Sequence, residues 1–145
     1  MIFLTTAAVM SAICALVSGT PVGDKGIPPV TPFGDTCDSI QLELGYWTEA
    51  HCEPDDNYGK VITSIGLDVC IGNDAGSLVA QENGGFSKGC TNTQFIRDAY
   101  GKLVLKAVCK DSNGKDQDSS LTLDFIENNR GCIMCFGHKG QCIKK

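Results

Sequence analysis

Apolar residues recur at every second position in four short stretches of the chain. These stretches cover residues 40–44, 63–67, 103–109 and 121–123. Successive side chains of a β-strand point to opposite faces, so each stretch predicts a strand with one face buried. The first of these strands is expected to include Leu44. No stretch has the spacing of a long amphipathic helix, which predicts an all-β fold.

Two tripeptides with turn chemistry separate apolar runs. They are residues 74–76 (Asp-Ala-Gly) and 129–131 (Asn-Arg-Gly). Asp and Asn bond to nearby backbone and Gly accepts a positive φ, so both tripeptides predict hairpin turns. Residues 68–71 and 124–126 each begin with Asp, which predicts single helical turns capped by that side chain.

The landmarks of the first half of the chain return in the same order in the second half. In the first half they are Cys37 and residues 48–52, 64–68 and 71–78, and in the second half they are Cys90 and residues 105–109, 120–124 and 126–133. Self-similarity of this kind predicts one pseudo-symmetric domain made of two related halves.

The N-terminus has the composition of a secretory signal peptide. Residues 2–17 are almost uniformly apolar or small. Residues 1–19 are therefore predicted to be a signal peptide, with a membrane anchor as the alternative. Four of the five prolines fall in residues 20–32, which predicts a linker or propeptide before a folded domain at residues 33–145.

Charge and hydropathy narrow the range of partners. The net charge is −5, and an acidic surface repels phosphate backbones, so nucleic acid is not an expected partner. No other long apolar run follows the signal peptide, so membrane insertion is not expected. The mature chain is predicted to be secreted and extracellular.

Cysteine usage agrees with export. Eight of the nine cysteines remain once Cys14 leaves with the signal peptide: Cys37, Cys52, Cys70, Cys90, Cys109, Cys132, Cys135 and Cys142. An even number in an exported chain predicts a disulfide framework, whose pairing the count alone leaves open. Zinc bound by Cys132, Cys135, His138 and Cys142 is the alternative, although their spacing matches no common zinc knuckle. We expect neither a metal nor another cofactor.

Catalysis has little support in the sequence. His51 and His138 are the only histidines, and no nucleophile elbow, phosphate-binding loop or HExxH motif occurs. A glycosidase would need a cleft holding two carboxyl groups, one with a raised pKa. A small domain with eight cysteines leaves little room for such a cleft, so a non-enzymatic protein is expected.

The doubled motifs resemble those of the cyanovirin-N homology domain family. The family is marked by an L-x-A-x-C strand, an S-x-x-L-[DN] strand and an I-x-N-x-x-G-x-[LI] hairpin. All three motifs occur in the second half, at residues 105–109, 120–124 and 126–133. The first half repeats them with Thr48 in place of the leucine. The resemblance covers roughly residues 33–135, most of the predicted mature chain.

The resemblance implies a cyanovirin-N-like fold of two repeats, at about residues 33–89 and 90–135, followed by a cysteine-containing tail at 136–145. Each repeat would carry a three-stranded sheet and a β-hairpin, and the repeats would exchange hairpins. It further implies disulfides Cys37–Cys52 and Cys90–Cys109. The other four cysteines keep three possible pairings, and we expect one bridge to tether the tail through Cys142.

By the same resemblance, the protein is expected to be a lectin for mannose-type oligosaccharides, active as a monomer or a domain-swapped dimer. One site would use Asp35, Thr36, Glu53, Asp55, Asn128, Asn129 and Arg130. A second would use Gly72, Asn73, Asp74, Ala75, Gln81, Asn83, Lys88, Gly89, Lys110 and Asp111. Four of these depart from the family, because Gly72, Ala75 and Lys88 replace acidic residues and Gly89 replaces a hydroxyl residue. The second site is therefore expected to be weakened or altered.

Several of these residues also have a purely structural interpretation. Asn73 and Asn128 would serve their turns, and the acidic residues would form a solvated loop. Trp47 shares strand parity with Glu49 and His51 and should point outward. It would then either cover an edge of the core or stack on a sugar ring. The alternative function is a secreted disulfide scaffold that has lost sugar binding and acts as a protein ligand, inhibitor or effector.

Overall fold

The computed structural model describes residues 31–56 and 59–144. The signal peptide predicted at residues 1–19, and the linker predicted at 20–32 up to residue 30, lie outside the described residues. The elements are α1 (Phe33–Thr36), β1 (Cys37–Glu43), β2 (Trp47–Cys52), β3 (Val61–Gly66), the 3-10 turn η1 (Leu67–Val69), β4 (Ile71–Asp74), β5 (Ser77–Ala80), the 3-10 turn η2 (Phe86–Lys88), β6 (Cys90–Arg97), β7 (Leu103–Lys110), β8 (Asp116–Thr122), β9 (Glu127–Asn129), β10 (Cys132–Cys135), β11 (His138–Lys139) and β12 (Gln141–Lys144). In this part of the chain no helix is long and apolar enough to cross a bilayer.

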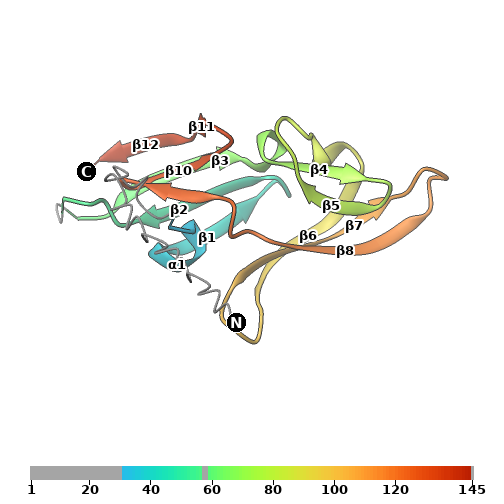
Figure 1. Ribbon diagram of the computed structural model, residues 1–145, viewed down its shortest axis with the longest axis horizontal. Coiled ribbons are helices and arrows are strands. Elements are labelled where there is room, and N and C mark those ends of the chain that lie inside the picture. The colour runs from blue at the N-terminus through green and yellow to red at the C-terminus, as the bar shows by residue number, and fades with distance from the viewer. Residues whose placement is uncertain (1–30, 57–58, 145) are drawn as a thin grey trace, which may run out of the picture.

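The strands form two main sheets, one at each end of an elongated molecule (Figure 1). The first has the order β1-β2-β3-β12 and the second has the order β6-β7-β8, with antiparallel pairing throughout. Along β2 the residues alternate between half-buried and buried, so Thr48, Ala50 and Cys52 face the core. The shared parity predicted for Trp47, Glu49 and His51 is confirmed, and so is the period-two pattern predicted for residues 63–67 in β3.

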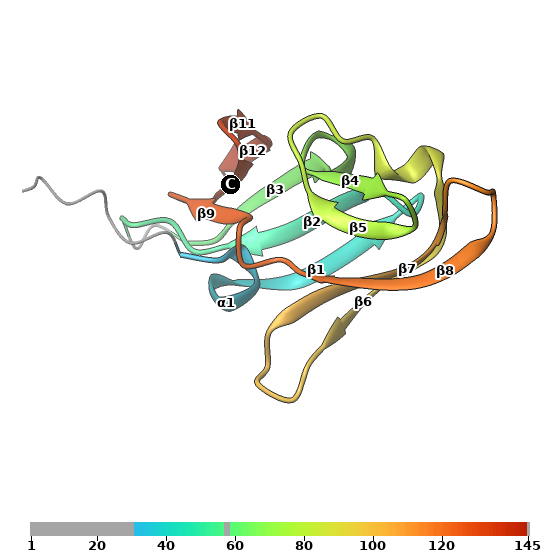
Figure 2. The ribbon, with the colours of Figure 1, turned by 45° about the vertical axis from the view of Figure 1, so that its right-hand side comes forward.

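Each repeat covers its sheet with the hairpin of the other repeat. The β4–β5 hairpin of the first repeat packs on β8, and the β9–β10 hairpin of the second repeat packs on β3 (Figures 1 and 2). The Leu78 N–H donates to Ser119 Oγ at 2.8 Å, and the Ile133 N–H donates to Thr63 Oγ1 at 3.0 Å. The expected exchange of hairpins is confirmed.

The two repeats match in detail. Phe33 in α1 and Phe86 in η2 are fully buried one turn before the first cysteine of each repeat. Both first strands then break their register, and Ser39 and Asn92 have positive φ at these breaks. The Pro32–Glu127 bridge likewise has a counterpart in the Gly72–Gly85 bridge. The pseudo-symmetry read from the sequence is therefore a property of the backbone.

Four disulfides connect the eight cysteines that were predicted to form a disulfide framework. Cys37–Cys52 and Cys90–Cys109 each join two adjacent strands of one sheet, as the resemblance implied. Cys70–Cys135 links the first repeat to the end of β10, and Cys132–Cys142 tethers the tail, as expected. Because these bonds consume the cysteines of the proposed zinc set, the zinc interpretation is wrong. Closing the loop of 65 residues between Cys70 and Cys135 should stabilise the fold by about 4 kcal/mol.

Residues beyond the second repeat extend the first sheet. The resemblance implied two three-stranded sheets, but β12 pairs with β3 and gives the first sheet a fourth strand. Glycine at position 140 allows the tail to approach β3 closely, because a Cβ there would lie 2.5 Å from the Ser64 carbonyl oxygen. The Gly140 N–H donates to the Ile133 carbonyl at 2.8 Å. The tail is thus an integral part of the first sheet.

Three local predictions differ from the structure. Leu44 is not in a strand: β1 ends at Glu43, and Leu44 lies in the following turn with φ +52° and 83% exposure. Leu67–Val69 forms a single helical turn, but no side chain caps it. The Asp68 carboxylate instead accepts hydrogen bonds from the Ser87 N–H and hydroxyl. Residues 124–126 form a hydrogen-bonded turn rather than a helical one.

The exchanged hairpins generate a stability prediction. Thr63 is 1% exposed, and Thr63→Val keeps its shape but leaves the buried Ile133 N–H without its acceptor. We expect the free energy of unfolding, measured by urea denaturation, to fall by about 1–3 kcal/mol. Ser119→Ala is the matched control in the other repeat. Ser119 is half-buried, so water can replace its hydroxyl and the loss should be smaller. An equal or larger loss for Ser119→Ala would contradict this account.

Candidate functional site

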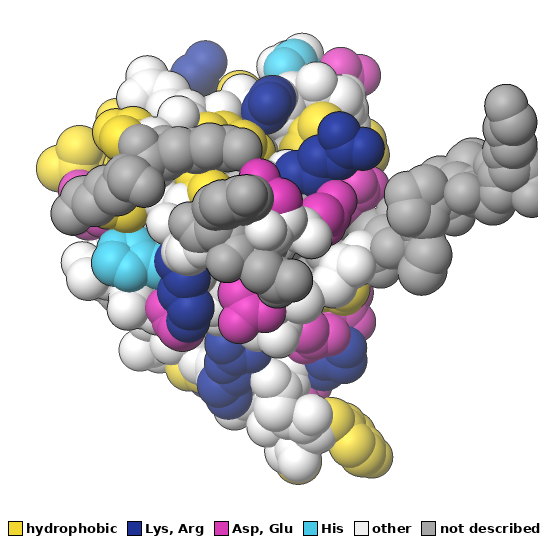
Figure 3. Space-filling model, turned by 90° about the vertical axis from the view of Figure 1, so that its left-hand side faces the viewer, with side chains coloured by type: hydrophobic (Ala, Val, Ile, Leu, Met, Phe, Trp, Pro, Cys, Tyr) yellow, Lys and Arg dark blue, Asp and Glu magenta, His cyan; other side chains and the backbone are white. Residues whose placement is uncertain are grey.

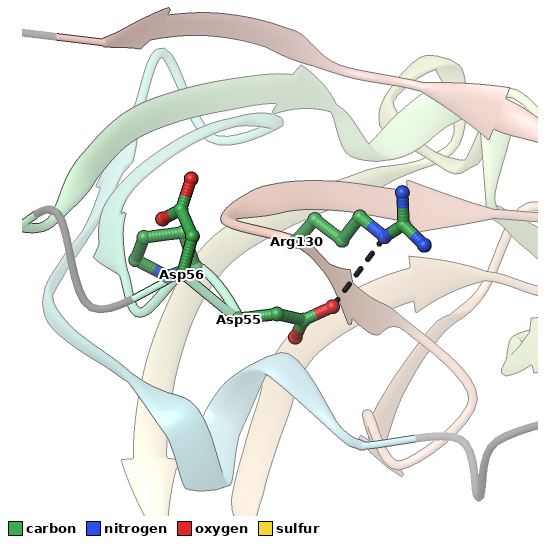
Figure 4. Close-up of a pocket in the computed structure, with 4 residues that line it drawn as sticks. Asp55, Asp56 and Arg130 are labelled. Atoms are coloured by element: carbon green, nitrogen blue, oxygen red, sulfur yellow. Dashed lines mark ion pairs between the residues drawn. The ribbon is translucent and has the colours of Figure 1, made fainter.

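The loop after β2 and the turn between β9 and β10 meet at one end of the molecule. Asp55 reaches from the loop toward Arg130 on the turn, with Asp55 Oδ2 3.4 Å from Arg130 Nε (Figure 4). Together with Pro54 and Asp56 they line a pocket of about 300 Å³. An adjoining pocket of about 270 Å³ is lined by Glu53, Pro54, Gly59 and Lys60. Predicted site residues from both repeats are thereby brought together.

Asn128 fixes the position of this turn. Its side-chain carbonyl accepts the Gly131 N–H at 2.8 Å, and its amide donates to the Glu53 carbonyl at 2.9 Å and to Thr36 Oγ1 at 3.0 Å. Gly131 itself has φ +89°, and a Cβ there would lie 2.6 Å from Val61 Cγ2. Asn128 therefore has the structural role expected for it, and it joins α1, the loop and the turn into one unit.

The charged groups of the pocket remain open to solvent. The side chains of Arg130 and Asp55 are 82% and 76% exposed, so their ion pair contributes little to stability. Figure 4 shows the terminal nitrogens of the Arg130 guanidinium pointing away from Asp55. Figure 3 shows acidic and basic side chains interspersed on this end of the molecule. A shallow pocket with adjacent carboxylate and guanidinium groups can accept and donate hydrogen bonds to a neutral polyhydroxyl ligand.

Two predicted residues of the first site face other partners. Asp35 Oδ2 lies 2.9 Å from Lys102 Nζ, and this contact, with Asp124 beyond it, raises the pKa of Lys102. The Asn129 amide lies 4.0 Å from Met134 Sδ. Sequence reasoning missed four lining residues: Pro54, Asp56, Gly59 and Lys60. Pro54 and Asp56 flank Asp55 and continue the acidic loop, which was the available signal.

The corresponding cluster of the other half is organised differently. Asn73 repeats the role of Asn128: its carbonyl accepts the Gly76 N–H at 2.8 Å, and its amide donates to the Lys110 carbonyl at 2.9 Å. Ala75 stands where the first site has Arg130, so no guanidinium reaches over the loop. At Gly89 a Cβ would lie 2.8 Å from Asn73 Nδ2, so the Asn73 amide is next to the space that a side chain at position 89 would need.

The remaining predicted residues of this cluster are engaged with the fold. The Asp111 carboxylate accepts N–H groups of Lys115 and Asn113 and the Gln117 amide, and Lys110 pairs with Asp116. The Gln81 side chain lies across Gly72, where an added Cβ would be 2.0 Å from Gln81 Oε1. Asp74, Asn83 and Lys88 are exposed around these groups. Gln81 and Asn73 therefore occupy the space beside Gly72 and Gly89, respectively.

Comparisons with known proteins agree with the fold described above. A family model described as the CVNH domain matches residues 33–134. A designed cyanovirin-N homolog lectin has 25% identity and a TM-score of 0.65, covering 72% of this chain and 99% of its own. GzCVNH of Gibberella zeae has 27% identity and a TM-score of 0.63, with 71% and 95% coverage. Microvirin, solved with mannobiose, has 25% identity and a TM-score of 0.61, with 72% and 98% coverage. No curated protein matches.

The hydrogen bonds to Asp111 predict a specific pH dependence. They hold the pKa of its carboxyl below the ordinary value, with the Lys115 N–H as the largest cause. The resulting stabilisation should be complete above the pKa of an unfolded aspartate, about 4. It should be lost as the pH falls through the lower pKa of the folded protein. We expect Asp111→Asn, which keeps one acceptor and removes the charge, to flatten the acid limb of the unfolding free energy.

Two measurements check this prediction. A carbon-detected NMR titration gives the Asp111 pKa directly, and urea denaturation at a series of pH values gives the stability. Asp74→Asn is the matched control, because it removes one exposed negative charge from the same cluster. An Asp111 pKa at or above the ordinary aspartate value would refute the assigned hydrogen bonds.

Proposed function

This chain belongs to the CVNH family, and we propose on that premise that it is a secreted, non-catalytic lectin for mannose-type oligosaccharides. The proposed binding site is the pocket between the Asp55 loop and the Arg130 turn together with the adjoining pocket lined by Glu53, and Asn128 is its positioning residue. The single observation that carries the proposal is the pairing of Asp55 with Arg130 beside a solvent-open pocket on a family scaffold.

The chemistry of this pocket suits a saccharide. Sugar hydroxyls both donate and accept, and the pocket offers carboxylate acceptors and guanidinium donors within a few ångströms. The Asn128 hydrogen bonds hold the loop and turn together before any ligand arrives, which limits the entropy lost on binding. Microvirin, at 25% identity, was solved with mannobiose, which favours a mannose-type ligand here.

Export is supported by the cysteine chemistry. Four disulfides are formed among the described residues, and disulfides persist mainly in oxidising compartments. The apolar N-terminal run has the composition of a signal peptide. These two features support the proposal that the protein acts outside the cell.

The altered second cluster favours one principal site per chain. Ala75 replaces the guanidinium, and Asp111 is held by its own loop. Monovalent affinity should then be modest, and strong binding would need several chains or several contacts on one glycan. The same alteration, with the two additional disulfides, also favours the second candidate function, a scaffold that binds a protein instead of a sugar.

Replacing Arg130 tests the proposed site. Arg130→Ala removes the donors and leaves the turn intact, because Ala75 has φ +48° at the matching position, close to the +54° of Arg130. We expect binding of mannose oligosaccharides, measured by titration calorimetry, to weaken at least tenfold, or about 1.4 kcal/mol. Asp55→Ala should weaken it similarly.

Asp118→Ala is the control, because it changes an exposed acidic residue of β8 that belongs to neither cluster and should leave affinity within twofold. A glycan array of the oxidised protein precedes these titrations. An array without any bound glycan, together with tight capture of a single protein partner, would overturn the lectin proposal and support the scaffold function.

A further inference from the structure

A groove lies on the outer face of the first sheet, at the far end of β2 and β3 from the Asp55–Arg130 pocket. It has a volume of about 240 Å³, and its lining includes Trp47, Ser64, Gly66, Val69, His138 and Gln141. Trp47 is the only tryptophan of the chain. The tail after β10 forms one wall, so the groove exists only because this chain continues past residue 134, where the family match ends.

The strand register places an aromatic ring beside a row of polar groups. Trp47 pairs with Gly66, and a Cβ at Gly66 would lie 3.4 Å from the indole, so the ring lies against the backbone of β3. One row along the same face, Glu49 pairs with Ser64, and Ser64 pairs with Gln141 on β12. This row therefore presents a carboxylate, a hydroxyl and an amide. Within the described residues none of these three side chains makes a hydrogen bond or ion pair.

The wall contributed by the tail is held at several points. Cys132–Cys142 and Cys70–Cys135 fix both ends of the segment that contains β11. His138 Nε2 lies 3.1 Å from Glu82 Oε1, which anchors the tail to the loop after β5. Because Gly140 also contacts the backbone of β3, the groove is formed before any ligand binds.

From this arrangement we propose that the groove is a second carbohydrate site, which binds one pyranose ring. The apolar face of the ring would stack on Trp47, and its hydroxyl groups would bond to Ser64 and Gln141, which line the groove. Glu49, which pairs with Ser64, lies beside the groove and offers a further acceptor at its edge. The volume is smaller than the roughly 300–1,000 Å³ of pockets for drug-sized ligands, which fits one sugar unit rather than a longer chain.

This site is separate from the one under the proposed function. Trp47 and Cys52 mark the two ends of β2, so the groove and the Asp55–Arg130 pocket lie about 17 Å apart along that strand. Two arms of one branched oligosaccharide could engage both sites, and their combined affinity would then exceed that of either. The groove makes no use of the residues of the second cluster.

Trp47 provides a reporter that is specific to this groove. We would titrate the oxidised protein with the methyl pyranosides of mannose, glucose, galactose and N-acetylglucosamine, each up to about 100 mM, a range set by millimolar single-sugar affinities. Indole fluorescence and the Nε1–H NMR signal are recorded together. We expect a saturable change with at least one sugar, weakened at least fivefold by Gln141→Ala and by Ser64→Ala.

Two variants keep the result unambiguous. Ile143→Ala changes an exposed residue of the same strand and should leave the titration unchanged. Arg130→Ala should also leave the indole response unchanged while it weakens binding at the first pocket. No saturable response to any of the four sugars, or a response lost in Arg130→Ala but kept in Gln141→Ala, would overturn the groove site. Neither outcome counts against the Asp55–Arg130 pocket, whose failure would instead appear in the calorimetry of the mannose oligosaccharides.

Discussion

The fold depends on the way each repeat is completed by a hairpin of the other. The β9–β10 hairpin covers β3 and the β4–β5 hairpin covers β8, so neither sheet has a complete core within its own repeat. In each contact a backbone N–H of the hairpin donates a hydrogen bond to a side-chain hydroxyl of the sheet. Ile133 donates to Thr63, and Leu78 donates to Ser119. Because strands β9 and β4 of these hairpins carry Asn128 and Asn73, the same exchange determines the position of each candidate site.

Much of this architecture follows from local sequence rules. Alternation predicted strands at residues 40–44, 63–67, 103–109 and 121–123, which correspond to β1, β3, β7 and β8, and the Gly-containing tripeptides predicted both hairpin turns. The prediction that the first strand includes Leu44 failed because Gly45 follows it and the chain turns there, with both residues at positive φ. Strand β12 carries no alternating apolar signal, and it is held instead by the Cys132–Cys142 disulfide and by pairing with the edge of β3. The pairing of Cys70 with Cys135 depends on tertiary contacts that the cysteine count does not contain.

The candidate site shows a similar division. The resemblance brought forward Asp55, Asn128 and Arg130, which the structure places around one pocket or its supporting turn. It did not indicate that Asp35 would turn toward Lys102, because that contact depends on the loop after β6, which is distant in sequence. The expectation that the second cluster is weakened or altered rests on Gly72, Ala75, Lys88 and Gly89, and it stays a prediction. The placement of Gln81 and Asn73 beside Gly72 and Gly89 required coordinates.

The Cys70–Cys135 bond has a consequence for self-association. It joins the first repeat to the second, as do both hairpin contacts and the pairing of β12 with β3. In a domain-swapped dimer, the first repeat of one chain would pack against the second repeat of the other. The Cys70–Cys135 bond would then connect two polypeptides, whereas Cys132–Cys142 would stay within one. Such an intertwined pair could no longer separate by dilution, because only a reductant would release it. Oxidation during folding would thus make the choice between one-chain and two-chain assemblies permanent.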